Sequence, residues 1–87
     1  MRYEVLWKKS AIGDIEKLDR KISRRITDKI LTHLTKDPLE LGLALRGEFA
    51  GLYRYRVDKW RVIYSVVLKK ELIIILRIEH RATVYES

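Results

Sequence analysis

The chain of 87 residues contains no cysteine and only one proline, and its longest unbroken apolar run is the five residues at positions 72–76. Without cysteine there are no disulfide bonds, thiolate metal ligands or cysteine nucleophile, which is typical of a reducing compartment. A run of five apolar residues is far shorter than the ~20 of a membrane-spanning helix. The first residues carry charge and lack the apolar core of a signal peptide. We therefore expect a cytoplasmic protein with no membrane partner.

The chain also has fewer acidic than basic residues. Twelve Asp and Glu face nineteen Lys and Arg, so the formal net charge is +7. Such an excess favours a polyanionic partner, but it does not distinguish RNA, DNA, an acidic protein segment or an anionic membrane surface. The hydrophobic share of 47% is patterned along the chain, which predicts a globular fold. The length suits one domain spanning 1–87.

The first half of the sequence predicts a strand followed by helices. Apolar residues alternate within positions 1–7, as in a short strand. From Ser10, the expected N-cap, apolar residues recur every three or four positions, and this helical pattern ends at Asp37 and Pro38. A turn within positions 19–23 would divide it into a two-helix hairpin, although the pattern does not require that break.

The second half predicts a sheet. A connector at 38–51 contains three of the four glycines, and β-rich runs follow at 52–57, 60–68 and 72–79. Short links between these runs predict an antiparallel meander. The expected fold class is therefore α+β: an N-terminal strand, a two-helix hairpin and a three-stranded antiparallel meander, with the helices packed on one face of the sheet.

Strand pairing in the middle hairpin sorts charge from apolar surface. If residues 58 and 59 form a two-residue loop, Arg56 opposes Arg61, and opposed residues project to the same face. The apolar face then carries Tyr53, Tyr55, Val57, Trp60, Val62, Tyr64 and Val66. The other face carries Arg54, Arg56 and Arg61. Guanidinium groups bind phosphate through paired hydrogen bonds, so this face is either an RNA-binding surface or an ordinary solvated strand face.

Three segments resemble motifs of the RelE/ParE toxin superfamily. Positions 45–57 (LRGEFAGLYRYRV) resemble its "LKG…G.YRLRV" segment, and positions 60–64 (WRVIY) are similar to its "YRVIY" strand. Positions 78–81 (IEHR), followed by VY at 84–85, resemble its C-terminal "IGHR…VY". Their order and spacing agree, and the expected order of elements matches the RelE-like fold over nearly the whole chain.

The resemblance implies a toxin of a type II toxin–antitoxin system. A cognate antitoxin would wrap or cap it, and operator DNA would be bound only through that pair. RelE-like members enter the ribosomal A site and cut mRNA, whereas ParE-like members keep the fold but inhibit DNA gyrase. The RelE-like branch is favoured because this chain matches its basic and tyrosine positions. These are Arg54 and Arg56, the phosphate-binding Arg61, and the C-terminal Arg81 and Tyr85.

The implied activity is that of a metal-independent endoribonuclease, in which the 2′-hydroxyl of the RNA attacks the adjacent phosphate. We assign charge stabilisation to Arg61 and Arg81. Tyr85 is the expected base because neighbouring cations favour the phenolate, although it could instead stack on a base or pack. His80 is expected to contact RNA, as an acid or a positioning group. No cofactor is expected, and two histidines with scattered carboxylates form no metal-ligand spacing.

Two departures from the family pattern keep other functions open. Arg54 and Arg56 stand where lysine is common, and arginine cannot act as a general base because it cannot be deprotonated. Glu79 stands where glycine usually precedes His-Arg, which adds a carboxylate near the site. The alternatives are a ParE-like, non-enzymatic gyrase inhibitor and an inactive module that binds antitoxin or acts as co-repressor.

Overall fold

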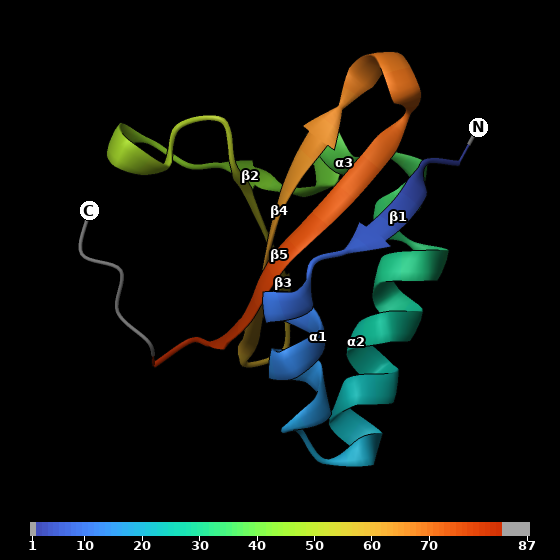
Figure 1. The fold of residues 1–87 in the computed structure, drawn as a ribbon, viewed down its shortest axis with the longest axis vertical. Helices are drawn as coiled ribbons and strands as arrows, with labels where there is room; N and C mark the ends of the chain where they lie inside the picture. Colours follow the sequence, from blue (N-terminus) through green and yellow to red (C-terminus); the bar gives the residue numbers. More distant parts are fainter. Residues whose placement is uncertain (1, 83–87) are drawn as a thin grey trace.

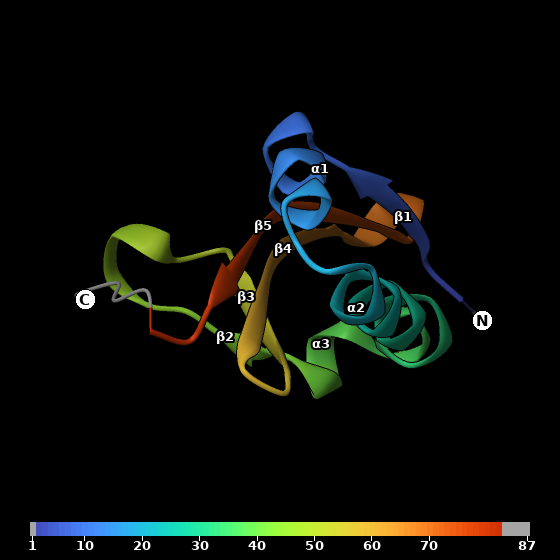
Figure 2. The ribbon, with the colours of Figure 1, turned by 90° about the horizontal axis from the view of Figure 1, so that it is seen from below.

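The computed structural model describes residues 2–82 as a five-stranded sheet covered on one face by helices (Figures 1 and 2). The strand order is β1-β5-β4-β3-β2. β1 is parallel to β5, and the other neighbours are antiparallel. The elements are β1 (Glu4–Trp7), α1 (Lys9–Glu16), α2 (Arg20–Thr32), α3 (Pro38–Leu41), β2 (Leu43–Ala44), β3 (Tyr53–Val57), β4 (Trp60–Val67) and β5 (Leu72–His80).

The predicted α+β class, with its helical hairpin on one face of the sheet, is confirmed. The break between the helices precedes Asp19, whose carboxylate caps α2 by accepting a hydrogen bond from the backbone N–H of Lys21. The prediction of Ser10 as N-cap is wrong. α1 begins after Lys8, and the Ser10 hydroxyl instead donates to the carbonyl of Leu76 on β5.

The sheet extends the predicted meander by one strand at each edge. β1 adds in parallel beside β5, and the short β2 adds beside β3 within the segment predicted as connector. Between β3 and β4 the predicted register is confirmed, with Arg56 opposite Arg61. Asp58 begins the loop in the left-handed region (φ 55°), which aspartate tolerates better than most residues. Its carboxylate also accepts both hydrogen bonds of Arg25, which ties the loop to α2.

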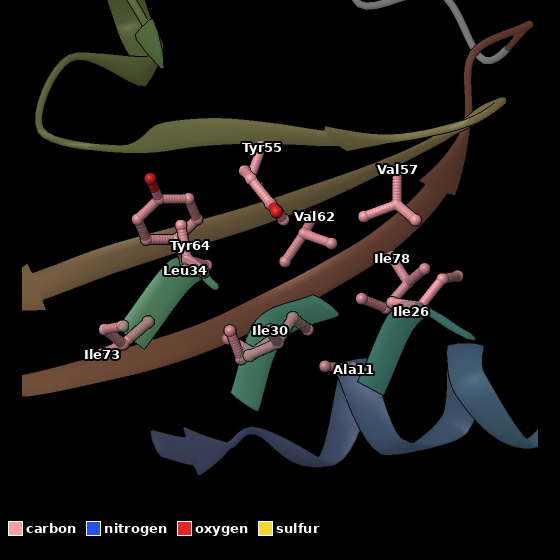
Figure 3. Packing of buried hydrophobic residues seen from close by; sticks show 11 residues of the cluster. Ala11, Ile26, Ile30, Leu34, Tyr55, Val57, Val62, Tyr64, Ile73 and Ile78 are labelled. Carbon is pink, nitrogen blue, oxygen red and sulfur yellow. The ribbon is translucent and has the colours of Figure 1, made fainter. Parts of the chain in front are cut away.

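The core lies between the helices and the sheet (Figure 3). It contains the predicted apolar face of the hairpin, with Tyr55, Val57, Val62 and Tyr64 buried, and Tyr53, Trp60 and Val66 packed partly buried against them. The helices contribute Ala11, Ile26, Ile30 and Leu34, and β5 contributes Ile73, Ile75 and Ile78. Because the core takes this face of the sheet, the arginines between the apolar positions are left on the other face.

Where β1 ends, α1 takes over the edge of β5. The backbone N–H of Lys8 donates to the carbonyl of Ile75, and the Ser10 hydroxyl bonds to the next carbonyl along the strand. Asp14 then accepts hydrogen bonds from the backbone N–H of Ile78 and from the guanidinium of Arg77. Burial raises the pKa of Asp14, but these hydrogen bonds and the charge of Arg77 outweigh burial and hold the pKa below its ordinary value.

Replacing Asp14 by asparagine should therefore destabilise the protein at neutral pH. We expect Asp14→Asn to lower the free energy of unfolding by about 1–2 kcal/mol at pH 7, since charged hydrogen bonds are lost. A depressed folded-state pKa stabilises above the unfolded pKa, and this stabilisation disappears as pH falls through the folded pKa. The difference should thus shrink below roughly pH 4. Urea unfolding at pH 7 and pH 3 measures it, with the exposed Asp28→Asn as control. Equal stability of Asp14→Asn and wild type at pH 7 would contradict the prediction.

Candidate active site

The face of the sheet away from the helices carries two rows of paired side chains. Along the first row Ile63 lies between Arg54 and Arg77, and along the second Arg61 lies between Arg56 and Glu79. We call these residues the arginine face: Arg54, Arg56, Arg61, Ile63, Arg77 and Glu79. Three adjacent strands thus bring four guanidinium groups to one side of the molecule.

Three of these arginines form no salt bridge within the described residues. Arg77 forms a salt bridge with Asp14, whereas Arg54, Arg56 and Arg61 take part in no ion pair within residues 2–82. Burial and the charges of Arg61 and Arg56 lower the pKa of Arg54, which shows that the cluster repels itself. Guanidinium groups stay protonated nevertheless. A bound anion would relieve this repulsion.

A pocket of about 610 Å³ lies over the arginine face. Its wall is formed by β2 and by the segment between β2 and β3, which lies on the side of the sheet away from α2 (Figure 2). The wall is largely apolar, with Leu43, Leu45, Phe49 and Leu52, and also includes Arg46. The floor includes Arg54, Arg61, Arg77 and Glu79. An apolar wall beside a cationic floor suits a nucleotide, whose base is apolar on its faces and whose phosphate is anionic.

Two buried polar atoms in the pocket lining have no hydrogen-bond partner within the described residues. They are Nε of Arg61 and Oε1 of Glu79, which belong to directly paired residues of β4 and β5. Glu79 is 9% exposed. Burial raises the pKa of Glu79 above its ordinary value, although the positive charges of Arg77 and Arg61 oppose this shift. Buried unpaired groups of this kind are uncommon and often mark ligand sites.

The structure brings together some of the site residues predicted from sequence and separates others. Arg54, Arg56 and Arg61 share one face as predicted. Arg81 follows β5, is exposed, and donates its backbone N–H to the carbonyl of Lys59 in the β3–β4 loop. Tyr85 lies outside the described residues.

His80 lies on the other face of the sheet. It pairs with Trp60 in the β4–β5 register, and their rings are in edge-to-face contact with centroids 5.0 Å apart. Trp60 packs against the core, so His80 points away from the arginine face. Its Nδ1 accepts a hydrogen bond from the backbone N–H of Ala82.

The sequence reasoning missed Arg46 and Arg77 as members of the site and treated Glu79 only as a departure from a motif. A signal for Arg77 and Glu79 was present in the alternation along β5. Ile73 and Ile75 are core residues, and strict alternation would place Arg77 and Glu79 on the same core face. Charge at core positions indicates that the strand changes face between them. Arg46 gave no comparable signal, since its place depends on the path of an irregular segment.

Within residues 2–82 no group of three or more histidine, aspartate or glutamate side chains is arranged to hold a metal ion. No helix in this range is both long enough and apolar enough to cross a membrane.

Comparison with known proteins gives similarity along nearly the whole chain. Residues 5–85 match a family model described as the ParE toxin of the type II toxin–antitoxin system parDE. The chain is 32% identical over 85 residues to Toxin RelG of Mycobacterium tuberculosis, covering 98% of each chain. It is 28% identical over 83 residues to Toxin RelE of the same organism, covering 95% of this chain and 86% of the relative. A chain in the crystal structure of the toxin–antitoxin complex RelBE2 from that organism superposes with a TM-score of 0.90 and 30% identity, covering 95% of each chain.

Proposed function

Because the chain belongs to the RelE/ParE superfamily of toxins from type II toxin–antitoxin systems, we propose that it is a ribosome-dependent endoribonuclease that cleaves mRNA in the A site and so inhibits translation. The observation that carries this proposal is the cluster of three arginines that form no salt bridge within residues 2–82, beside a nucleotide-sized pocket. Gyrase inhibition by a surface contact would not require such a pocket. The relatives named RelG and RelE also favour this branch.

RNA cleavage requires stabilisation of developing negative charge, binding of the RNA backbone in the reactive geometry, and proton transfer. The 2′-hydroxyl of one nucleotide attacks the neighbouring phosphorus, and the phosphorane that forms carries more negative charge than the substrate. Arg61 and Arg81 would stabilise that charge, because fixed cations aimed at developing charge lower the barrier. Arg54 and Arg56 would hold the RNA backbone in line through paired hydrogen bonds. Tyr85 keeps the role that resemblance gives it, in proton transfer or in stacking on a base.

The cognate antitoxin is the proposed regulatory partner. The solved structure reported above is a toxin–antitoxin complex, which supports a bound antitoxin for this chain as well. A helix of the antitoxin would pack on part of the apolar surface of the toxin. Operator DNA would be recognised only by the complex of toxin and antitoxin. Ribosome and mRNA are the proposed targets of the free toxin in the cytoplasm.

A second candidate function is non-enzymatic inhibition of DNA gyrase, since the matching family model is described as ParE. A third is an inactive module that binds antitoxin. The same fold serves all three functions, so the distinction depends on the site.

One experiment separates the three functions. The protein is induced alone, and message 5′ ends and plasmid supercoiling are measured in the same cells. We expect new ends within translated codons, and an identical message lacking its start codon should stay intact because cleavage requires the ribosome. Loss of supercoiling with intact messages would support gyrase inhibition instead. Neither effect would support the inactive module.

A further inference from the structure

Glu79 is the one acidic residue of the arginine face, and the assigned roles leave it unused. It is a buried carboxyl on β5, it lines the pocket, and its Oε1 has no hydrogen-bond partner within the described residues. Its cross-strand neighbour Arg61 has a buried, equally unpaired Nε. A buried polar atom without a partner costs free energy. Two such atoms on directly paired residues therefore indicate a ligand that supplies both partners.

The two unpaired atoms define what that ligand must offer. Nε of Arg61 is a donor and requires an acceptor, such as a phosphate oxygen. An ionised Glu79 is an acceptor only and requires a donor, such as a hydroxyl. A ribonucleotide places a 2′-hydroxyl next to its 3′-phosphate and so presents both groups together. DNA presents the phosphate but lacks the hydroxyl.

We propose that Glu79 is the general base that accepts the proton of the attacking 2′-hydroxyl, while Arg61 binds the phosphate that is attacked. This inference rests on the proposed endoribonuclease function and names the group that activates its nucleophile. Glu79 and Arg61 are held by paired strands rather than by a loop, and a rigid support of this kind keeps a base in position.

Other residues of the site are less suited to this step. Arg54 and Arg56 cannot give up a proton and so cannot act as bases. His80 lies on the opposite face of the sheet, against Trp60. The carboxylate of Asp14 is already occupied by Arg77 and the backbone N–H of Ile78. With Glu79 as the base, Tyr85 serves to stack on a nucleobase.

The step balances without a co-reactant other than water. The O2′–H bond breaks and its proton passes to a Glu79 carboxylate oxygen, while the O2′–phosphorus bond forms. The bond between phosphorus and O5′ then breaks, which leaves a 2′,3′-cyclic phosphate. O5′ takes a proton from water, and Glu79 returns its own proton to the hydroxide so formed.

The surroundings of Glu79 make it a stronger base than an exposed carboxylate. The charged groups that face it are Arg61 on β4, Arg77 on its own strand, Asp14 on α1 and Arg46 in the pocket wall. Burial dominates over the nearby cations and raises the pKa of Glu79, which brings a carboxyl closer to the range in which bases are most effective. Cleavage should lose rate as pH falls through this pKa, because the protonated carboxyl cannot accept the proton.

The test is single-turnover cleavage of ribosome-bound mRNA by purified wild-type protein and Glu79→Gln, followed from acid to neutral pH. We expect Glu79→Gln to cleave about 100-fold more slowly and to lose the decline in rate on the acid side. Its melting temperature should equal or exceed that of wild type, since a neutral amide is easier to bury than a carboxylate. Glu40→Gln removes one charge from an exposed residue on α3 and should cleave like wild type.

Glu79→Asp keeps a carboxylate and serves as the second variant. It should retain the acid-side decline at a reduced rate. Retention of the decline in Glu79→Asp together with its loss in Glu79→Gln is a pattern that a purely structural role for Glu79 would not produce. If Glu79→Gln cleaves at the wild-type rate, or slows while keeping the wild-type pH profile, Glu79 is not the base and the endoribonuclease function stands. If the wild-type protein itself leaves ribosome-bound mRNA intact, the function and the base assignment fail together.

Discussion

Replacing Arg61 by alanine is expected to slow mRNA cleavage about 1000-fold, the upper end of what a single stabilising group contributes. Inducing the Arg61→Ala variant should therefore not arrest growth. Arg61 occupies the middle of its row, between Arg56 and Glu79. Its guanidinium is the one on the arginine face whose Nε is buried and unpaired within the described residues. Arg61 also lines the pocket.

The size of this effect follows from the geometry. A cation that is fixed and partly shielded from water stabilises a developing charge more than a mobile surface cation does. Arg56 is exposed, and so it should contribute mainly to binding. Removing Arg61 relieves repulsion with Arg54 but also removes a cation beside the buried Glu79, so the melting temperature of the variant is measured to show that it folds. A loss of activity can then be assigned to the site.

Two further variants make the test specific. Arg24→Ala removes the same charge from the exposed surface of α2 and should leave cleavage within about threefold of wild type, since a lone exposed charge matters little. Arg61→Lys restores the charge but not the Nε donor or the planar fork, so it should recover only part of the rate. Cleavage by Arg61→Ala within threefold of wild type would remove this arginine from the mechanism.

The hairpin of β3 and β4 shows how far sequence alone can specify a site. A two-residue loop fixes the register, and the register with strict alternation places every side chain on one face or the other. Arg54, Arg56 and Arg61 were therefore placed together correctly from the sequence. No such local rule covers β1, whose parallel pairing with β5 joins segments more than sixty residues apart.

The β4–β5 pair shows why the rest of the site was not predicted. Val67 opposes Leu72, and this register continues to Tyr64 opposite Ile75. Beyond that point the register shifts by one, with Ile63 opposite Arg77, so Leu76 is the extra residue of a β-bulge.

The bulge decides which residues reach the arginine face. Without it, Arg61 would oppose Ile78, and Glu79 would oppose Trp60 on the core side of the sheet. With it, Glu79 reaches the arginine face and His80 leaves it. The sequence prediction placed His80 at the RNA, and only the register shows that its side chain lies on the other face of the sheet. The Ser10 hydroxyl was predicted to cap α1, but it donates instead to the carbonyl of Leu76, the extra residue of this bulge.

Replacing Gly42 by alanine is expected to cause the largest loss of stability among single-methyl additions to the glycines, about 3 kcal/mol of unfolding free energy. A Cβ at position 42 would lie 1.7 Å from Oη and 2.8 Å from Cζ of Tyr64. Tyr64 is fully buried, and its hydroxyl donates to the carbonyl of Pro38 at 2.6 Å. The ring cannot move aside freely because it also stacks on Tyr53, with centroids 5.6 Å apart.

The chain offers a matched control and a rescue for this prediction. Gly13 lies within α1, and a Cβ there would meet no atom within 4 Å. Gly13→Ala should therefore stabilise the protein by about 0.5–1 kcal/mol, since alanine favours helix over glycine. Tyr64→Phe removes Oη, so Gly42→Ala should cost less in that background, with a coupling free energy of about 1 kcal/mol or more. Urea unfolding of the single and double variants measures this coupling. Strict additivity, or an unchanged stability of Gly42→Ala alone, would show that the contact between Gly42 and the Tyr64 hydroxyl does not hold the β2 edge against the core.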